Sequence, residues 1–119
     1  MKMRVSAKFI LPFLALLAAA ACAGALPEVT PAVEAAYVAR WPAADAAQLR
    51  SGRALFIQRC SGCHPLPNPA KHDAIGWDKT LNAMSGKAHL DANSREMVQR
   101  YLTFTGERQS GRRTHRTPD

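Results

Sequence analysis

The sequence predicts a small all-α protein with one folded domain, and three observations carry this prediction. The chain has 119 residues, which is about the size of one domain. Apolar residues recur with helical spacing in three segments, 45–59, 73–84 and 92–104. The alternation of apolar and polar residues that marks a strand is not found along the sequence. We therefore expect three main helices.

Residues 1–21 have the parts of an export signal. Three basic residues stand near the start, residues 9–17 form a short apolar core, and four alanines follow. The apolar core is too short for a transmembrane helix. We therefore expect a signal peptide over residues 1–21 and export to the bacterial periplasm.

Cys22 follows this leader and is the third cysteine of the chain. In an exported protein an odd cysteine is left without a disulfide partner, so its presence needs an explanation. The run Ala19-Ala20-Ala21-Cys22 resembles the lipobox of bacterial lipoproteins, although leucine is usual where Ala19 stands. We expect lipidation at Cys22, which would tether the protein to a membrane surface without spanning it. The alternative is cleavage after Ala23 or Ala25 and a soluble periplasmic protein.

The charge of the chain is concentrated outside its central part. The formal net charge is +7, but three basic residues belong to the leader and four arginines lie within residues 106–119. The central part is therefore only mildly basic. Together with export, this argues against nucleic acid as a partner.

The flanks of the expected domain, which spans residues 45–105, differ from it in composition. Residues 22–44 are rich in alanine and proline and are expected to be a spacer that partly folds against the domain. Within them Thr30-Pro31 predicts a short helix that ends before Pro42. Residues 106–119 are polar and basic, which predicts a stop at Gly106 and a disordered tail.

The first main helix is expected from Asp45, a good N-cap, to Arg59. Leu49 and Phe56 fall near one face of this helix. Gly52 lies on the same face and favours close packing of another helix, with a tolerated surface glycine as the alternative.

The second main helix is expected over residues 73–84. Trp77, Leu81 and Met84 share one of its faces. Gly86 is expected to end the helix as a left-handed cap.

The third main helix is expected over residues 92–104, with Asp91 as N-cap. Its expected buried stripe contains Met97, Tyr101 and Phe104.

The run Cys60-Ser61-Gly62-Cys63-His64 has the pattern of a c-type haem attachment site. Two thiols separated by two residues match the two vinyl groups of a haem, to which they add as thioethers. The next residue, His64, then falls beneath the iron as its proximal ligand. We therefore expect one haem c per chain, covalently bound through Cys60 and Cys63.

Other chemistry for the two cysteines is less well supported by the sequence. A thiol–disulfide redox pair is expected within a βαβ pattern, which is not found here. A zinc site needs four ligands, and His72 and His89 are poorly spaced to complete one. A disulfide between Cys60 and Cys63 would be strained.

Met84 is the expected distal ligand of the iron, since it stands at a helix end from which a side chain can reach across a haem. The alternative is a flexible core residue beside Trp77. His72 and His89 are other candidates for the ligand, and an open sixth site is a further one. Met97 lies inside a helix and is expected in the core.

Residues 49–102 resemble a short class I cytochrome c domain. The resemblance lies in the run Leu49 to Phe56, the haem motif, Met84 and the segment Leu90 to Leu102. It implies a small cytochrome c-like domain in which three main helices pack around the haem.

The same resemblance implies specific contacts. Gly52 and Phe56 would cross the last helix near Tyr101. A proline carbonyl would orient His64, and the candidates are Pro65, Pro67 and Pro69. The interval between His64 and Met84 is short for the family, which implies a more open haem edge. We expect Trp77 to pack on the haem, with a hydrogen bond to a propionate as the alternative.

The function expected from these features is electron transfer between redox partner proteins, without enzymatic activity. Lys71, Lys79 and Lys87 could surround the haem edge and steer an acidic partner, and an ordinary solvated face is the alternative. Two other functions stay open. One is a ligand sensor or peroxidase with an open sixth site, and the other is an accessory haem subunit of a larger oxidoreductase complex that docks through the tail.

Overall fold

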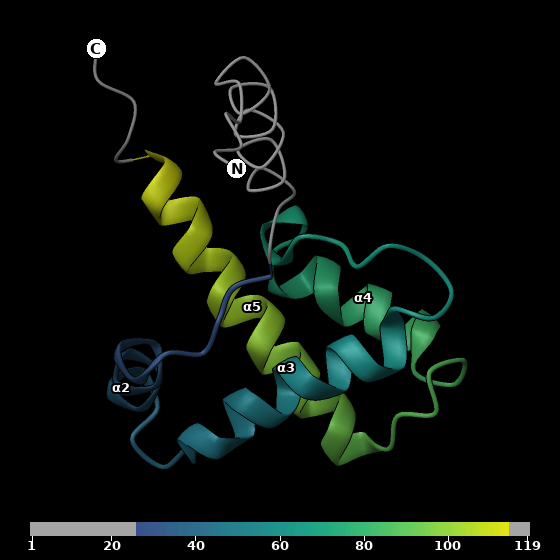
Figure 1. Cartoon of the computed structure of the whole chain (residues 1–119), viewed down its shortest axis with the longest axis horizontal. Helices are drawn as coiled ribbons and strands as arrows, with labels where there is room; N and C mark the ends of the chain where they lie inside the picture. The colour runs from purple at the N-terminus through teal and green to yellow at the C-terminus, as the bar shows by residue number, and fades with distance from the viewer. Residues whose placement is uncertain (1–25, 115–119) are drawn as a thin grey trace, which may run out of the picture.

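The computed structural model describes residues 26–114, and it forms helices and no strand over that range (Figure 1). The all-α prediction is confirmed. The leader, Cys22 and residues 115–119 lie outside the described residues. The elements in chain order are α2 (Pro31–Arg40), α3 (Ala46–Cys60), the short 3-10 helix η3 (Pro69–Lys71), α4 (Ala74–Met84) and α5 (Ala92–Thr114).

Each of the four α-helices begins at a polar cap, and for three of them, α2, α3 and α5, the sequence analysis names the capping residue. At each start a side-chain oxygen accepts a hydrogen bond from a backbone N–H of the first turn. These N–H groups have no carbonyl partner within the helix, so the cap supplies the missing acceptor. The capping residues are Thr30, Asp45, Asp73 and Asp91. These bonds explain why the predicted starts agree with the structure.

The core is the crossing of α3 over α5 (Figure 1). Gly52 is buried at the crossing, and a Cβ atom on it would lie 2.1 Å from the carbonyl oxygen of Met97. The rings of Phe56 and Tyr101 lie beside each other, with centroids 6.3 Å apart. The predicted contact of Gly52 and Phe56 with α5 near Tyr101 is confirmed, and the surface-glycine alternative is wrong.

Helix α2 belongs to the folded body. Tyr37 is fully buried and its ring meets the ring of Phe104 on α5 edge-on, at a centroid distance of 5.4 Å. Trp41 completes this aromatic cluster. The short helix predicted from Thr30 is confirmed, and its burial shows that this stretch of the expected spacer carries part of the core.

Helix α5 runs past the predicted stop at Gly106 and ends at Thr114, so the expected end at Phe104 is wrong. Gly106 is buried against Pro69, whose carbonyl oxygen would lie 2.4 Å from a Cβ atom on residue 106. The glycine therefore serves a close contact within a continuing helix. Beyond it Glu107 pairs with Arg40, which ties the extension to α2.

The turn after α4 also differs from the expectation. Gly86 does not adopt a left-handed conformation, and Ser85 caps the helix with helical angles. The left-handed residue is His89, with a φ of 52°. None of the helices within residues 26–114 is long and apolar enough to cross a membrane.

Candidate haem site

The motif Cys60 to His64 lies where α3 ends and the chain turns away. Cys60 is the last residue of α3 and is half-buried, whereas Cys63 and His64 are exposed in the turn that follows. Both cysteines are free thiols. Burial raises the pKa of the Cys60 thiol, and the nearby Cys63 raises this pKa further. Because both thiols are free, the disulfide alternative is not realised in this structure.

The ring of His64 has a defined orientation. Its Nδ1 atom lies 2.9 Å from the carbonyl oxygen of Pro65. A carbonyl only accepts hydrogen bonds, so Nδ1 carries the proton and donates, and Nε2 is left as the nitrogen that can bind a metal. Of the three candidate prolines, Pro65 makes this contact. The carbonyl of Pro69 instead accepts the indole N–H of Trp77 at 2.9 Å.

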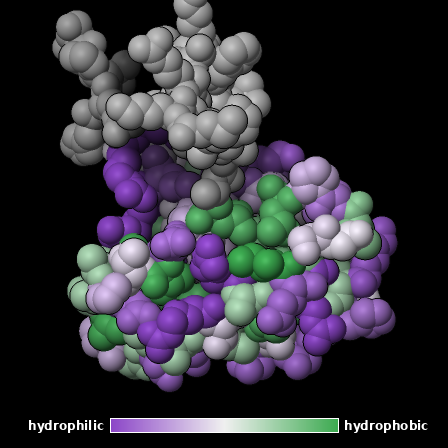
Figure 2. Space-filling model, in the orientation of Figure 1, coloured by the Kyte–Doolittle hydropathy of each residue, from purple (hydrophilic) through white to green (hydrophobic). Residues whose placement is uncertain are grey.

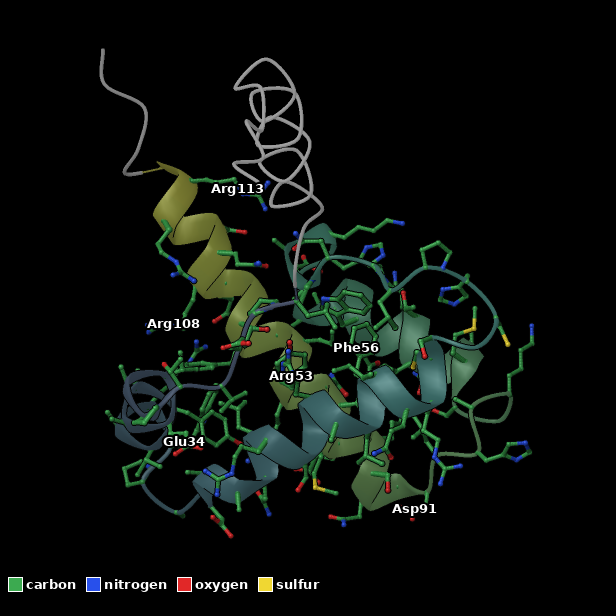
Figure 3. The ribbon with its side chains drawn as sticks, viewed as in Figure 1. Glu34, Arg53, Phe56, Asp91, Arg108 and Arg113 are labelled. Carbon is green, nitrogen blue, oxygen red and sulfur yellow. The ribbon has the colours of Figure 1, made fainter. Side chains whose placement is uncertain are left out.

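A cavity of about 230 Å³ opens beside the motif, between the end of α3 and the inner face of α4. All four predicted haem-binding residues line this cavity: Cys60, Cys63, His64 and Met84. Its apolar walls are formed mainly by Phe56, Trp77 and Leu81. Figure 3 shows Phe56 extending from α3 toward α4, and Figure 2 shows apolar side chains reaching the surface on the face that carries α3 and α4.

These residues fit a covalently bound haem. Two thiols separated by two residues, an imidazole with a free Nε2 and a thioether meet at one apolar cavity, which is the donor set of a c-type haem with histidine and methionine ligands. They do not fit a zinc ion, because the described part of the chain contains no group of three or more His, Cys, Asp or Glu residues that could hold a metal.

Among the candidates for the distal ligand, Met84 is the one that lines the cavity. It is the last residue of α4 and is half-buried. His72 lies outside the lining and packs edge-on against Trp77, with ring centroids 4.9 Å apart. His89 is exposed in the turn after α4, and Met97 is half-buried on α5.

The indole nitrogen of Trp77 already makes a hydrogen bond within the protein. Its side chain is 1% exposed, and its indole N–H donates to Pro69. The ring also meets Phe56 edge-on, at a centroid distance of 6.4 Å. This arrangement favours the expected packing role, since the N–H is not available to a propionate.

Two cations stand at the cavity, Arg59 and Lys87. Lys71 and Lys79, which the sequence also suggested, are exposed but do not line it. Sequence reasoning missed Arg59, although its position directly before Cys60 was a usable signal. Thr80, also missed, lines the cavity from α4, and its hydroxyl donates to the carbonyl of Gly76.

Comparison with known proteins gives a partial similarity to a c-type cytochrome. The chain is 34% identical over 58 residues to the cytochrome c-type protein TorC of Escherichia coli (strain K12), a match that covers 49% of this chain and 15% of that protein. The protein of the same name from Escherichia coli O157:H7 is 33% identical over the same length.

The chain thus spans about 15% of the length of these relatives. No family model and no solved structure matches it. The similarity supports a cytochrome c-like domain and agrees with the all-helical fold and the residues that line the cavity.

Proposed function

We propose that this chain is a mono-haem c-type cytochrome that carries single electrons between redox proteins of the bacterial periplasm. One observation carries the proposal: the two thiols, the imidazole and the thioether predicted from the sequence line a single apolar cavity. The partial similarity to a c-type cytochrome supports it. The proposed role is electron transfer without enzymatic activity, so we assign no residue as a catalytic acid or base.

Each residue has a distinct role in this proposal. Cys60 and Cys63 hold the haem covalently, His64 is the proximal ligand and Met84 is the distal ligand. Haem c supplies an iron that is stable as both the ferrous and the ferric ion. The protein excludes water with Phe56, Trp77 and Leu81, and the Pro65 carbonyl orients the imidazole. An apolar environment of this kind tunes the reduction potential.

Absorption spectra of the exported protein in both oxidation states test the cofactor and its attachment. A haem spectrum that survives denaturation and acidic extraction is expected, because thioether bonds are covalent. A protein isolated without haem, or one that releases it on extraction, would contradict the proposal.

The variant Met84→Ala tests the distal ligand. It should abolish the methionine-to-iron absorption band of the ferric protein and lower the reduction potential, because a thioether ligand favours ferrous iron. Met97→Ala is the matched control, since Met97 lies on α5 outside the lining of the cavity. If Met84→Ala kept the band, the ligand would be another residue.

The two cations at the cavity suggest the chemistry of a partner. Arg59 and Lys87 are exposed and line the cavity, so we propose an acidic surface on the donor or the acceptor. Electron transfer should then slow as ionic strength rises, and the charge-reversed double variant Arg59→Glu/Lys87→Glu should lose most of this salt dependence. An unchanged salt dependence would contradict an acidic partner.

We also propose that residues 1–21 are a cleaved signal peptide and that Cys22 carries a lipid anchor. This rests on the sequence of the leader. Mass spectrometry of the mature protein should find a diacylglyceryl-modified Cys22, and Cys22→Ser should release the protein into the soluble periplasmic fraction. A mature chain that begins beyond Cys22 would indicate simple cleavage.

A further inference from the structure

Arg95, near the start of α5, makes a set of hydrogen bonds to the outer face of α4. Its Nη2 atom donates to the Oδ1 atoms of Asp78 at 2.6 Å and Asn82 at 2.7 Å, and lies 3.2 Å from the backbone carbonyl of Asp78. Its Nη1 atom donates to Gln99 on its own helix at 2.9 Å, which holds the guanidinium in place. One side chain thus joins two successive turns of α4 to α5.

These contacts lie on the same helix as the wall of the cavity. Asp78 and Asn82 are one helical turn apart on α4, while Trp77, Leu81 and Met84 of that helix face the cavity. The bond from Trp77 to Pro69 secures the first turn of α4. Among residues 26–114, the pair of Arg95 with Asp78 is the one ion pair that involves α4.

The end of α4 that carries Met84 is held by two kinds of contact: the burial of Leu81, which is 3% exposed within the core, and the polar contacts of Arg95. Met84 is the last residue of α4, and the chain then passes through the turns of residues 85–89, where His89 is left-handed. The hydroxyl of Ser85 bonds to Leu81, and Leu90 bonds back to Ser85, so these contacts are local to the turn. The position of Met84 therefore follows the position of α4 on α5.

We propose that Arg95 is a positioning residue for the distal ligand: by joining α4 to α5 it keeps the thioether of Met84 at the iron against competing ligands. This inference rests on the proposed function. Loss of the Arg95 contacts would let α4 move away from α5 more often, and the sixth position would then be open for a larger fraction of the time. An external ligand would bind with a correspondingly higher apparent affinity.

The test is a titration of the ferric haem protein with imidazole, followed by its absorption spectrum. Arg95→Ala should bind imidazole about tenfold more tightly than the unaltered protein. The apparent affinity rises in proportion to the fraction of molecules whose sixth position is open, and we expect the lost contacts to raise that fraction about tenfold. The methionine-to-iron band of this variant should also weaken. Arg95→Lys keeps the charge but has one terminal nitrogen in place of two, so it lacks the second arm that bonds Gln99 while the first reaches Asp78 and Asn82, and it should restore the unaltered affinity only in part.

Arg100→Ala is the matched control. Arg100 lies on the same helix and pairs with Glu96 of that helix and with Tyr37 of α2, without a bond to α4. The imidazole affinity of the Arg100→Ala variant should equal that of the unaltered protein. If Arg100→Ala and Arg95→Ala raised the affinity equally, general loosening would explain both results and the positioning role would be refuted.

Other outcomes separate this inference from the proposed function. An unaltered protein without a methionine-to-iron band would refute Met84 as the ligand. An unaltered protein with the band and an Arg95→Ala variant with unchanged imidazole affinity would refute the role of Arg95 alone. Should Arg95→Ala not fold, the double variant Asp78→Ala/Asn82→Ala removes both side-chain acceptors of the Arg95 Nη2 atom, and an unchanged affinity in that variant would equally overturn the proposal.

Discussion

Gly52 of α3 lies directly against the backbone of Met97 on α5. A Cβ atom at position 52 would meet the Met97 carbonyl oxygen at 2.1 Å and the carbonyl carbon at 2.7 Å, so the two helices approach more closely than any larger residue allows. This approach brings Phe56, one turn further along α3, beside Tyr101 and next to the cavity. The helix crossing therefore places the end of α3, where the haem motif lies.

Gly52→Ala should destabilise the protein by roughly 3 kcal/mol, because backbone atoms of α5 would have to move to admit a methyl group. Thermal or denaturant unfolding followed by far-ultraviolet circular dichroism measures this loss. Gly111→Ala on α5 is the control. A Cβ atom there has no neighbour within 4 Å, so alanine should stabilise the helix by up to about 1 kcal/mol. Equal effects in the two variants would contradict the close crossing.

The sequence predicts those parts of the fold that depend on local chemistry. The helix starts follow from Thr30, Asp45, Asp73 and Asp91, because a capping oxygen acts within one turn of its own position. The glycine on an apolar helix face predicts close packing at Gly52, and the resemblance to a cytochrome c domain implies that the partner is the last helix near Tyr101. The roles of the haem motif and Met84 stay predictions, although the structure brings these residues to one cavity.

Other features depend on contacts between distant segments, which one sequence does not display. Gly106 resembled a helix stop, but Pro69 packs against it and the helix continues. Gly86 resembled a left-handed cap, but that conformation belongs to His89. The bonds of Arg95 to α4 join residues far apart in the chain and have no sequence pattern of their own.

Gly106→Ala should disturb the cavity wall from a distance. A Cβ atom at position 106 would lie 2.4 Å from the carbonyl oxygen of Pro69, and this oxygen accepts the indole N–H of Trp77. Displacing the carbonyl should weaken that bond and cost roughly 2 kcal/mol of stability. The indole N–H of Trp77 should then exchange with solvent faster in nuclear magnetic resonance spectra. The indole of Trp41 is the internal reference, and equal acceleration at both tryptophans would argue against this route.

Tyr37→Ala tests whether α2 is a part of the core. Tyr37 is 0% exposed and its ring contacts those of Trp41 and Phe104, so truncation should cost about 3–5 kcal/mol in the free energy of unfolding. Tyr37→Phe keeps the rings and removes only the long bond from Arg100, at 3.4 Å, so its cost should stay below about 1 kcal/mol. A small loss for the alanine variant would instead support a loosely attached spacer.

Tyr101 should make the stability fall at alkaline pH. Its hydroxyl donates to the Pro27 carbonyl at 2.8 Å, and burial raises its pKa to about 12, against about 10 in an unfolded chain. Below pH of about 10 the phenol is neutral in both states and the stabilisation is complete. As the pH rises toward about 12, the unfolded chain ionises first, so folding loses stability of roughly 3 kcal/mol at most.

Tyr101→Phe isolates this contribution. At neutral pH the variant should be about 1 kcal/mol less stable, because the bond to Pro27 is lost and Arg53 is left as the side-chain donor to that carbonyl. Denaturant unfolding of both proteins from pH of about 8 to about 12 should show this difference shrinking and then reversing sign, since the phenylalanine has no proton to lose. Titrations elsewhere in the chain are common to both proteins and cancel in the comparison. A difference that stayed constant over this range would show that the Tyr101 hydroxyl titrates alike in the folded and unfolded chains.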